Sequence, residues 1–389
     1  MPNIKRGMMG AAGGVSSVAK GEFWSWGSNQ AYALGRTPEG EHMSSPVQVG
    51  TATDWTEITG WPMGGAAVDS DGKLFTWGSN SRTALGRGGG SFSGADRQSP
   101  VQVGSLTDWS NVGCAKDGGF LAVKTDGTLW GWGDNRDGHL GLGDTTDRNS
   151  PVQVGSLTDW KMVTGSYLGN VCAIKTDGTL WSWGFNTNGA VGNSSVLHVS
   201  SPVQVGSLTT WSTVSQSNRS NHALKTDGTI WFWGKDQGGS SGLNSYGIAR
   251  SSPVQIGSLT NWVGFFGSAN NSMMVNSSDE LWITGNDDNG QCGTGATSGG
   301  NNSPVQAVGT GWYTATALMK MASAAQNTQI AIKVDGTLWQ WGRGAGNNSG
   351  LGGGNTDNSA PTQLGSLSTW VNISSTQNAQ SLWAIKEPS

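Results

Sequence analysis

Residues 124–133 read Lys-Thr-Asp-Gly-Thr-Leu-Trp-Gly-Trp-Gly, and this stretch decides the fold. Asp126-Gly127 stands between two short apolar runs and predicts a tight hairpin, because glycine supplies the positive φ that such a turn needs. In the strand that follows, the two-residue period places Trp130 and Trp132 on one face of a sheet and Leu129 on the other. Since both faces are apolar, we expect this strand to be sandwiched between neighbouring sheets.

The same stretch recurs along the chain in units of roughly 50 residues. Each unit also holds a Ser-Leu-Thr-x-Trp segment and a Pro-Val-Gln segment, which supply a first and a fourth strand. The Trp-Gly step occurs at Trp26, Trp77, Trp132, Trp183, Trp233 and Trp341, with a degenerate copy at Thr284, and the proline occurs at Pro46, Pro100, Pro151, Pro202, Pro253, Pro304 and Pro361. Seven copies of each element predict an all-β, seven-bladed β-propeller with four-stranded antiparallel blades.

The two ends of the chain predict how the ring closes. Leu382 to Lys386 match the second strand of a unit, but no third strand follows them. The missing strand is present at the other end of the chain, as Phe23 to Gly27. One blade is therefore expected to mix N- and C-terminal strands, which removes exposed sheet edges. We assign residues 18–389 to the propeller and the glycine-rich residues 1–17 to a flexible arm.

The repeated motifs resemble those of a known family. Thr-Asp-Gly-Thr-Leu-Trp-x-Trp-Gly, Ser-Pro-Val-Gln-Val and the Asn-x-x-Gly-x-x-Gly loop, at Asn135 to Gly141 and Asn186 to Gly192, are similar to repeats of the regulator of chromosome condensation family, especially its bacterial and bacteriophage branch. The family includes a nuclear guanine-nucleotide exchange factor, a plant UV-B photoreceptor and a bacterial β-lactamase inhibitor. The resemblance implies the propeller fold but no single function, because one fold hosts many functions.

Composition narrows the possible partners. Only 12% of the residues are charged and the net charge is −4, with no Lys/Arg cluster, so nucleic acid is not an expected partner. No apolar run is long enough to span a bilayer, and we expect no membrane insertion. The three cysteines fall at different phases of the repeat and predict neither disulfides nor a metal site; each is expected to be a small buried or loop residue.

The sequence predicts no enzymatic centre, no cofactor and no metal. The four histidines, His42, His139, His198 and His222, occur singly, without a cysteine or carboxylate at ligand spacing. The 21 tryptophans fall at strand positions with a regular packing explanation, and the Gly-Trp-Arg-His-Thr motif of the plant photoreceptor is absent.

Two departures from the repeat give the candidate binding residues. The loop between Trp-Gly and Ser-Pro holds 17 or 18 residues in six units, but 21 residues at 79–99. This loop carries Arg82, Arg87, Phe92 and Arg97. A second insertion lies between Trp312 and Ile332, some six residues longer than its counterparts, and contributes Tyr313, Met319 and Lys320. Such irregular loops are where a repeat scaffold carries binding sites, although surface loops also tolerate neutral insertions.

The leading functional hypothesis is a non-enzymatic binding or structural module. Low charge, a surface rich in Ser, Thr and Asn, and an N-terminal arm able to thread into a larger assembly favour a virion-surface or extracellular protein that engages a protein or glycan through propeller-face loops. One alternative is a cytoplasmic regulator of a small GTPase, by analogy with the exchange factor of the family. Another is a lectin-like propeller.

The most degenerate repeat is the one that contains Thr284. Thr284 replaces the second tryptophan, and Ser278-Asp279-Glu280 replaces the Asp-Gly-Thr turn. We expect either a reshaped hairpin or compensation by neighbouring residues, and a blade of lower stability, because a large buried ring is missing.

Overall fold

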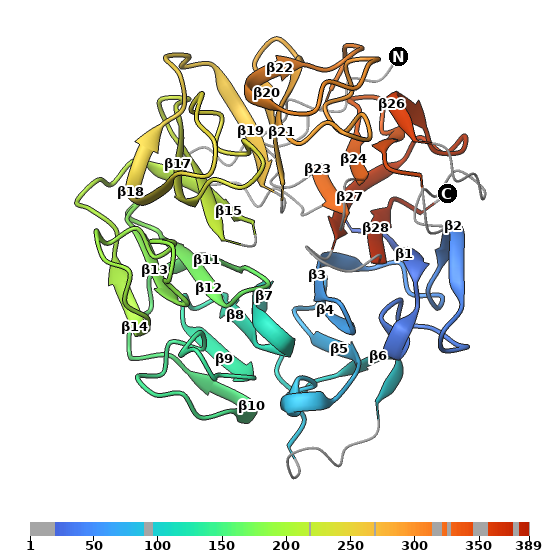
Figure 1. Ribbon diagram of the computed structural model, residues 1–389. Coiled ribbons are helices and arrows are strands. Elements are labelled where there is room, and N and C mark those ends of the chain that lie inside the picture. The colour runs from blue at the N-terminus through green and yellow to red at the C-terminus, as the bar shows by residue number, and fades with distance from the viewer. Residues whose placement is uncertain are drawn as a thin grey trace, which may run out of the picture.

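Seven four-stranded antiparallel sheets stand around a common axis in the computed structural model (Figure 1). The predicted all-β, seven-bladed propeller is therefore confirmed. Only three short 3-10 segments, and no α-helix, accompany the strands in the described part of the chain, which holds no helix able to cross a membrane. The structure describes residues 20–88, 96–217, 219–267, 270–312, 321–324, 328–344, 357–375 and 381–388.

Each blade runs from an innermost strand at the axis to an outermost strand at the rim. Blade I contains β3 (Trp55–Trp61), β4 (Gly64–Asp69), β5 (Leu74–Gly78) and β6 (Arg97–Gln102). Blade II contains β7 (Trp109–Cys114), β8 (Phe120–Lys124), β9 (Leu129–Gly133) and β10 (Arg148–Gln153). Blade III contains β11 (Trp160–Gly165), β12 (Asn170–Lys175), β13 (Leu180–Gly184) and β14 (Val199–Gln204).

Blades IV to VI follow the same order. Blade IV contains β15 (Trp211–Gln216), β16 (Ser220–Lys225), β17 (Ile230–Lys235) and β18 (Ala249–Gln255). Blade V contains β19 (Trp262–Gly267), β20 (Asn271–Asn276), β21 (Leu281–Gly285) and β22 (Asn301–Gln306). Blade VI contains β23 (Met321–Ala324), β24 (Thr328–Ile332), β25 (Leu338–Gly342) and β26 (Asn358–Gln363).

Blade VII is built from both ends of the chain, as predicted. Its order is β27 (Trp370–Ser375), β28 (Ser381–Lys386), β1 (Glu22–Ser28) and β2 (His42–Gln48). Strands β1 and β28 pair over six residues, and Lys386 Nζ lies 3.1 Å from Glu22 Oε2. Gly21 and Trp55 exchange two backbone hydrogen bonds, which join blade VII to blade I. Closure by mixed termini therefore leaves neither end of the chain as an unpaired strand edge.

The hairpin turn in each blade is fixed by local chemistry. Asp126 Oδ1 accepts hydrogen bonds from the backbone N–H and the hydroxyl of Thr128, at 2.9 and 2.7 Å, and the Thr128 hydroxyl in turn accepts one from the Trp130 indole. Gly127 has a φ of 78°, and a Cβ there would lie 2.2 Å from the carbonyl oxygen of Thr158. Glycine is therefore required both by the turn and by the close approach of the next blade.

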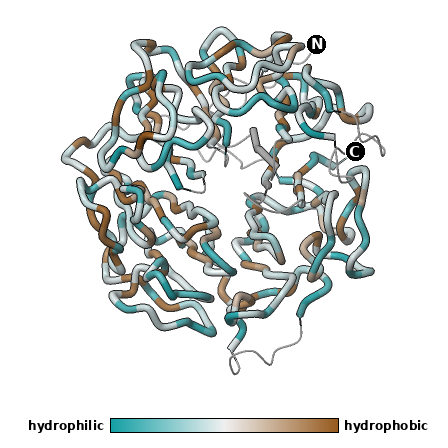
Figure 2. Tube along the Cα trace, in the orientation of Figure 1, coloured by the Kyte–Doolittle hydropathy of each residue, from teal (hydrophilic) through white to brown (hydrophobic). Residues whose placement is uncertain are grey.

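The hydrophobic core is divided among the interfaces between blades. Every buried cluster joins residues of adjacent blades, and hydrophobic stretches occur all around the ring (Figure 2). The tryptophan of each Trp-Gly step lies in such an interface: the Trp183 indole is fully buried and donates to the carbonyl of His139 in the preceding blade, at 2.9 Å. The equivalent pairs are Trp77 with Ala33, Trp132 with Ala84, Trp233 with Ala190, and Trp341 with Gln291. The packing interpretation of these tryptophans is confirmed.

The two ends of the propeller differ in character. At one end, the short-turn face, a lysine lies over two tryptophan rings: Lys175 Nζ is 5.0 Å from the Trp160 ring and 4.3 Å from the Trp181 ring. The same arrangement recurs at Lys124, Lys225 and Lys333. The other end, the long-loop face, carries the connections between the third and fourth strands, and each of five loops reaches the next blade through a backbone hydrogen bond, such as Gly143 to Ser200 at 2.8 Å.

Blade V keeps the hairpin despite its degenerate sequence. Asp279 takes the place of the turn glycine with a φ of 62°, a conformation that aspartate tolerates better than most residues. Asn276 Oδ1 accepts from the backbone N–H groups of Ser278 and Glu280, as Asp69 Oδ1 does from those of Asp71 and Lys73 in blade I. The hairpin is thus not reshaped. The sequence offers the insertion after Trp312 as one neighbouring segment that could compensate for the missing ring, and this insertion falls largely outside the described residues.

Removal of residues 381–389 is predicted to abolish the cooperative unfolding transition. The deletion removes β28 and with it the buried Leu382, Trp383 and Ile385, whose burial contributes on the order of 6 kcal/mol. It also exposes the edges of β1 and β27. Calorimetry measures the effect, with removal of residues 388–389 as the control because β28 stays intact. A truncated protein that melts like the full chain would contradict closure by mixed termini.

Candidate binding surface

Charged side chains gather on the long-loop face where blades I and II meet. Asp134 lies at the centre of this cluster and is fully buried. Its carboxylate lies 2.7 Å from Arg136 Nε, 3.6 Å from Arg82 Nε and 3.5 Å from His139 Nε2. A buried carboxylate needs such compensation because removal from water is costly. Arg82, one of the predicted binding residues, thus joins blade I to blade II, and it also lies 3.7 Å from Asp147.

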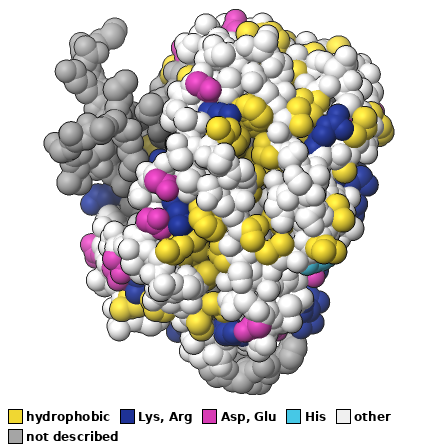
Figure 3. All heavy atoms as spheres, turned by 90° about the vertical axis from the view of Figure 1, so that its left-hand side faces the viewer, with side chains coloured by type: hydrophobic (Ala, Val, Ile, Leu, Met, Phe, Trp, Pro, Cys, Tyr) yellow, Lys and Arg dark blue, Asp and Glu magenta, His cyan; other side chains and the backbone are white. Residues whose placement is uncertain are grey.

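The cluster extends to the surface through two further ion pairs. Arg136 pairs with Asp117, and Lys116 Nζ lies 2.7 Å from Asp137 Oδ2. All four side chains are partly exposed. Because only 12% of the residues are charged, this concentration is a distinctive feature of the surface. The side of the molecule that carries β14 and β18 is, by contrast, mainly uncharged (Figure 3).

The other predicted arginines belong to the same blade I loop as Arg82. Arg87 is largely exposed, and Arg97 begins β6 and is half-buried. Desolvation, and then the neighbouring charge of Arg97, lower the pKa of Arg87. Phe92 lies outside the described residues.

The structure describes only the residues that flank the second set of candidate binding residues. Tyr313, Met319 and Lys320 all lie outside the described residues. The residues that flank them, Trp312 and Met321, belong to blade VI. Blade VII separates blade VI from blade I, so the two irregular segments belong to different sectors of the ring.

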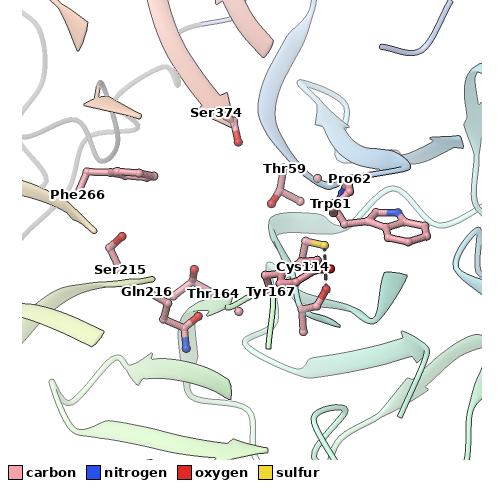
Figure 4. A pocket seen from close by; sticks show the side chains of 13 residues that line it. Thr59, Trp61, Pro62, Cys114, Thr164, Tyr167, Ser215, Gln216, Phe266 and Ser374 are labelled. Atoms are coloured by element: carbon pink, nitrogen blue, oxygen red, sulfur yellow. Dashed lines mark hydrogen bonds between the residues drawn. The ribbon is translucent and has the colours of Figure 1, made fainter. Parts of the chain in front are cut away.

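A shallow depression lies at the centre of the long-loop face (Figure 4). Side chains from the ends of inner strands and the loops after them line it, among them Trp61, Cys114, Tyr167, Gln216, Phe266 and Ser374. Its volume of about 60 Å³ is far below the roughly 300–1,000 Å³ of pockets that bury drug-sized ligands. The shape therefore suits contact with another surface more than enclosure of a small molecule.

The depression and the charged cluster are continuous. Gly118, which follows Lys116 and Asp117, lies directly against Trp61: a Cβ on this glycine would be 3.2 Å from Trp61 Cζ2. The sequence analysis missed the depression, because its residues come from six blades. The signal that could have found it is the variation at the last positions of the inner strands, where Gly60, Cys114, Gly165 and Gln216 each stand five residues after the first tryptophan of their strand.

A hydrogen bond between a serine and a histidine is a feature of catalytic nucleophiles, so the direction of the bond between Ser272 and His222 decides whether this pair is one. Ser272 Oγ lies 3.0 Å from His222 Nε2, and both residues are buried. The serine hydroxyl donates to the carbonyl of Ser240 at 2.8 Å, so His222 Nε2 carries the proton between them. A histidine that acts as base toward serine must instead accept the serine proton. The pair therefore holds blades IV and V together and is not a nucleophile.

One group of carboxylates has the spacing of a metal site. Oxygens of Asp54, Asp69 and Asp71 lie within 4.8 Å of one another. Asp69 Oδ1 already accepts from the backbone N–H groups of Asp71 and Lys73, and Lys73 Nζ lies 2.7 Å from Asp71 Oδ2. Turn formation and a lysine counter-charge therefore explain this group. The three cysteines are buried and free, as expected, and burial raises the pKa of Cys172 and Cys292 to about 12.

Comparisons with known proteins identify the class of propeller. The model of the regulator of chromosome condensation (RCC1) repeat matches residues 71–121, 126–172 and 177–223. The RCC1 domain-containing protein RUG3, mitochondrial, of Arabidopsis thaliana is 31% identical over 213 residues, which are 51% of this chain and 46% of that protein. The chain is thus a seven-bladed propeller in which three consecutive segments between residues 71 and 223 match the RCC1 repeat, so the resemblance to RCC1 repeats is confirmed. The comparisons do not show its bacterial and bacteriophage branch.

Solved structures agree on the fold. Human WBSCR16 has a TM-score of 0.79 at 13% identity, covering 95% of this chain and 99% of that chain. Prp20p of Saccharomyces cerevisiae has a TM-score of 0.77 at 18% identity, covering 96% and 93%. At these identities the likeness shows the fold alone. This chain spans about half the length or less of the curated relatives it matches.

His222 is predicted to destabilise the protein progressively between pH 6.5 and about pH 4. Burial lowers the pKa of His222 from 6.5 to about 4, so in this range the unfolded chain binds a proton at this residue that the folded chain does not. The contribution of His222 to the free energy of unfolding therefore decreases as the pH falls, by up to about 3 kcal/mol, whereas Glu57, whose pKa burial raises to about 7, acts in the opposite direction. Denaturant unfolding across the range measures the slope, which His222→Gln should reduce. His198→Gln, at an exposed position, should leave it unchanged; equal slopes for all three proteins would contradict the prediction.

Proposed function

We propose that the protein is a non-catalytic binding module that engages a partner protein through the long-loop face. One contrast carries this proposal. The short-turn face repeats one lysine–tryptophan arrangement from blade to blade, whereas the long-loop face holds the charged cluster and the central depression, which belong to single blades or junctions. Interactions that hold the blades together recur from blade to blade, whereas the residues of a binding site differ from those at the equivalent positions of other blades.

Chemistry and comparison support a protein partner. Paired charges around Arg136 and Lys116 lie next to aromatic side chains at the depression, and protein interfaces combine such groups. Prp20p of Saccharomyces cerevisiae has binding properties to Gsp1p and histones. A protein partner for the present chain rests on this analogy and on the surface itself.

We propose further that the module acts on a virion surface or outside the cell. The low charge, the Ser/Thr/Asn-rich surface and the resemblance to bacterial and bacteriophage repeats support this location, and the glycine-rich residues 1–17 would join it to a larger assembly. A cytoplasmic regulator of a small GTPase is the competing function, supported by the exchange-factor analogy and by the likeness to Prp20p. A glycan ligand is favoured by Tyr246, which is 72% exposed beside polar residues of the blade IV loop.

Substitutions on the long-loop face are expected to weaken partner capture at least about tenfold, the scale of a hot-spot residue. Arg87→Glu reverses an exposed charge in the same loop as Arg82, and Tyr167→Ala removes an aromatic ring from the depression. Quantitative mass spectrometry of proteins captured from the source organism measures the loss. Lys161→Glu is the matched control, because Lys161 is exposed near the short-turn end of β11. Partners lost equally from the control, or retained by both face variants, would contradict the proposed surface.

Mass spectrometry of fractions from the native source is expected to locate the protein in purified virions or in the medium. Recovery of the entire pool from cytosol would reject that location and favour the GTPase regulator. Because binding is measured separately with purified protein, a wrong location leaves the assignment of the long-loop face intact.

A further inference from the structure

An open pocket lies on the outer flank of the ring between blades IV and V. Its volume is about 470 Å³, within the range typical of small-molecule sites. Leu243, Ile256, Trp262, Trp282 and Pro304 supply its apolar lining, and Asn244, Gln255 and Ser303 add polar groups. The pocket lies apart from the charged cluster of blades I and II.

The repeat explains why a pocket exists here. In blade III the Trp183 indole packs against Gly141 and Val154: a Cβ on Gly141 would lie 2.9 Å from Trp183 Nε1 and 3.2 Å from Val154 Cγ1. In blade I, Trp77 and Pro100 similarly flank Gly35.

In blade V the counterparts of these neighbours are Gly242, Ile256 and Pro304. All three line the pocket, and a Cβ on Gly242 would meet Ile256, Thr284 and Pro304 within 3.6 Å. Thr284 stands where the other six blades carry the indole. The pocket therefore adjoins the position of a missing indole ring, and part of its wall is shaped by the repeat to hold one.

Thr284 itself does not line the pocket. It is fully buried, and its hydroxyl oxygen lies 2.9 and 2.7 Å from the carbonyl oxygens of Gly239 and Asn301, which share its one proton. These bonds satisfy the polar group but supply no ring. A cavity left by the loss of a large apolar side chain keeps its affinity for an aromatic ring, because its apolar walls gain little from water.

The hydrogen-bond acceptor at the position that receives the indole N–H elsewhere has other partners here. In blade IV the carbonyl of Ala190 accepts two bonds, from Trp233 Nε1 at 2.8 Å and from Asn221 Nδ2 at 2.6 Å. Its counterpart is the carbonyl of Ser240, which accepts from Ser272 Oγ at 2.8 Å. Ser272 corresponds to Asn221, and His222 is a further hydrogen-bond partner of the Ser240 backbone. The polar groups that line the pocket itself are those of Asn244, Gln255 and Ser303.

A second substitution changes the same tryptophan pair. In blade III, Lys175 lies over the rings of Trp160 and Trp181, whereas blade V has Asn276 in the lysine position. The Asn276 side chain donates to Glu280 at 2.6 Å instead. The lysine that lies over Trp160 and Trp181 thus has no counterpart over Trp262 and Trp282. Two independent departures from the repeat therefore adjoin one pocket.

We propose that this pocket is a binding site for a small planar aromatic ligand of indole size that carries an N–H donor. The ring would pack between Ile256, Pro304 and the Trp262–Trp282 pair, in place of the missing side chain. The ligand would thereby complete the interface between blades IV and V.

Titration of 5-fluoroindole, followed by fluorine NMR, tests the site directly. Wild-type protein is expected to bind the probe saturably, with a dissociation constant below about 1 mM, as suits a ligand of this size. Thr284→Trp restores the repeat and fills the pocket, so it should weaken binding at least tenfold while raising the melting temperature. Thr284→Ser keeps the hydroxyl and the space, and should bind like wild type.

A second variant keeps the test decisive if Thr284→Trp does not fold. Ser303→Trp places a ring at an exposed position of the pocket wall, and it too should weaken probe binding. Absence of saturable binding to wild type would overturn the proposal. So would affinity that is unchanged in every folded variant with a blocked pocket. Neither result bears on the long-loop face, which the probe does not contact.

Discussion

The fold depends on one interaction between neighbouring blades: a tryptophan ring packs against the preceding blade and donates its N–H to a loop carbonyl there. Trp183 and the carbonyl of His139 show this contact, and four further blades repeat it. The ring buries a large apolar area, while the hydrogen bond satisfies the polar atom that burial would otherwise leave without a partner. A single blade cannot bury either of its faces alone. The ring must therefore close, and the pairing of β1 with β28 closes it.

Because the ring depends on contacts between blades, the residues that make these contacts are restricted, and a surface for function must be built from other residues. On the short-turn face, close packing restricts the sequence: a Cβ on Gly127 would meet a carbonyl of the next blade, and Lys175 is held over two rings. The long-loop face is connected to the next blade mainly by backbone hydrogen bonds, which do not constrain side chains. Partly exposed side chains such as Lys116 and Asp137 can therefore vary there at little cost to the ring, and a binding surface can arise.

Blade V shows how local and tertiary constraints can be satisfied separately. Its hairpin survives because Asp279 adopts the positive φ of the missing glycine and Asn276 accepts backbone hydrogen bonds from the turn, as Asp69 does in blade I. The interface with blade IV is different. Thr284 satisfies its hydroxyl but cannot fill the space of a ring, so the repeat geometry persists around a pocket.

The sequence by itself determined the number of blades, the four strands in each and the closure by both termini, because period-two alternation and Asp-Gly turns are local and repeat in register. It also singled out Arg82 and Thr284 as departures from the pattern. Only the tertiary structure decided what those departures mean. Arg82 meets Asp134 from the next blade, and the space beside Thr284 is bounded by Ile256 of one blade and Pro304 of another. The central depression escaped prediction for the same reason: its residues come from strands more than 300 positions apart, and only closure of the ring brings Thr59 and Ser374 to one opening.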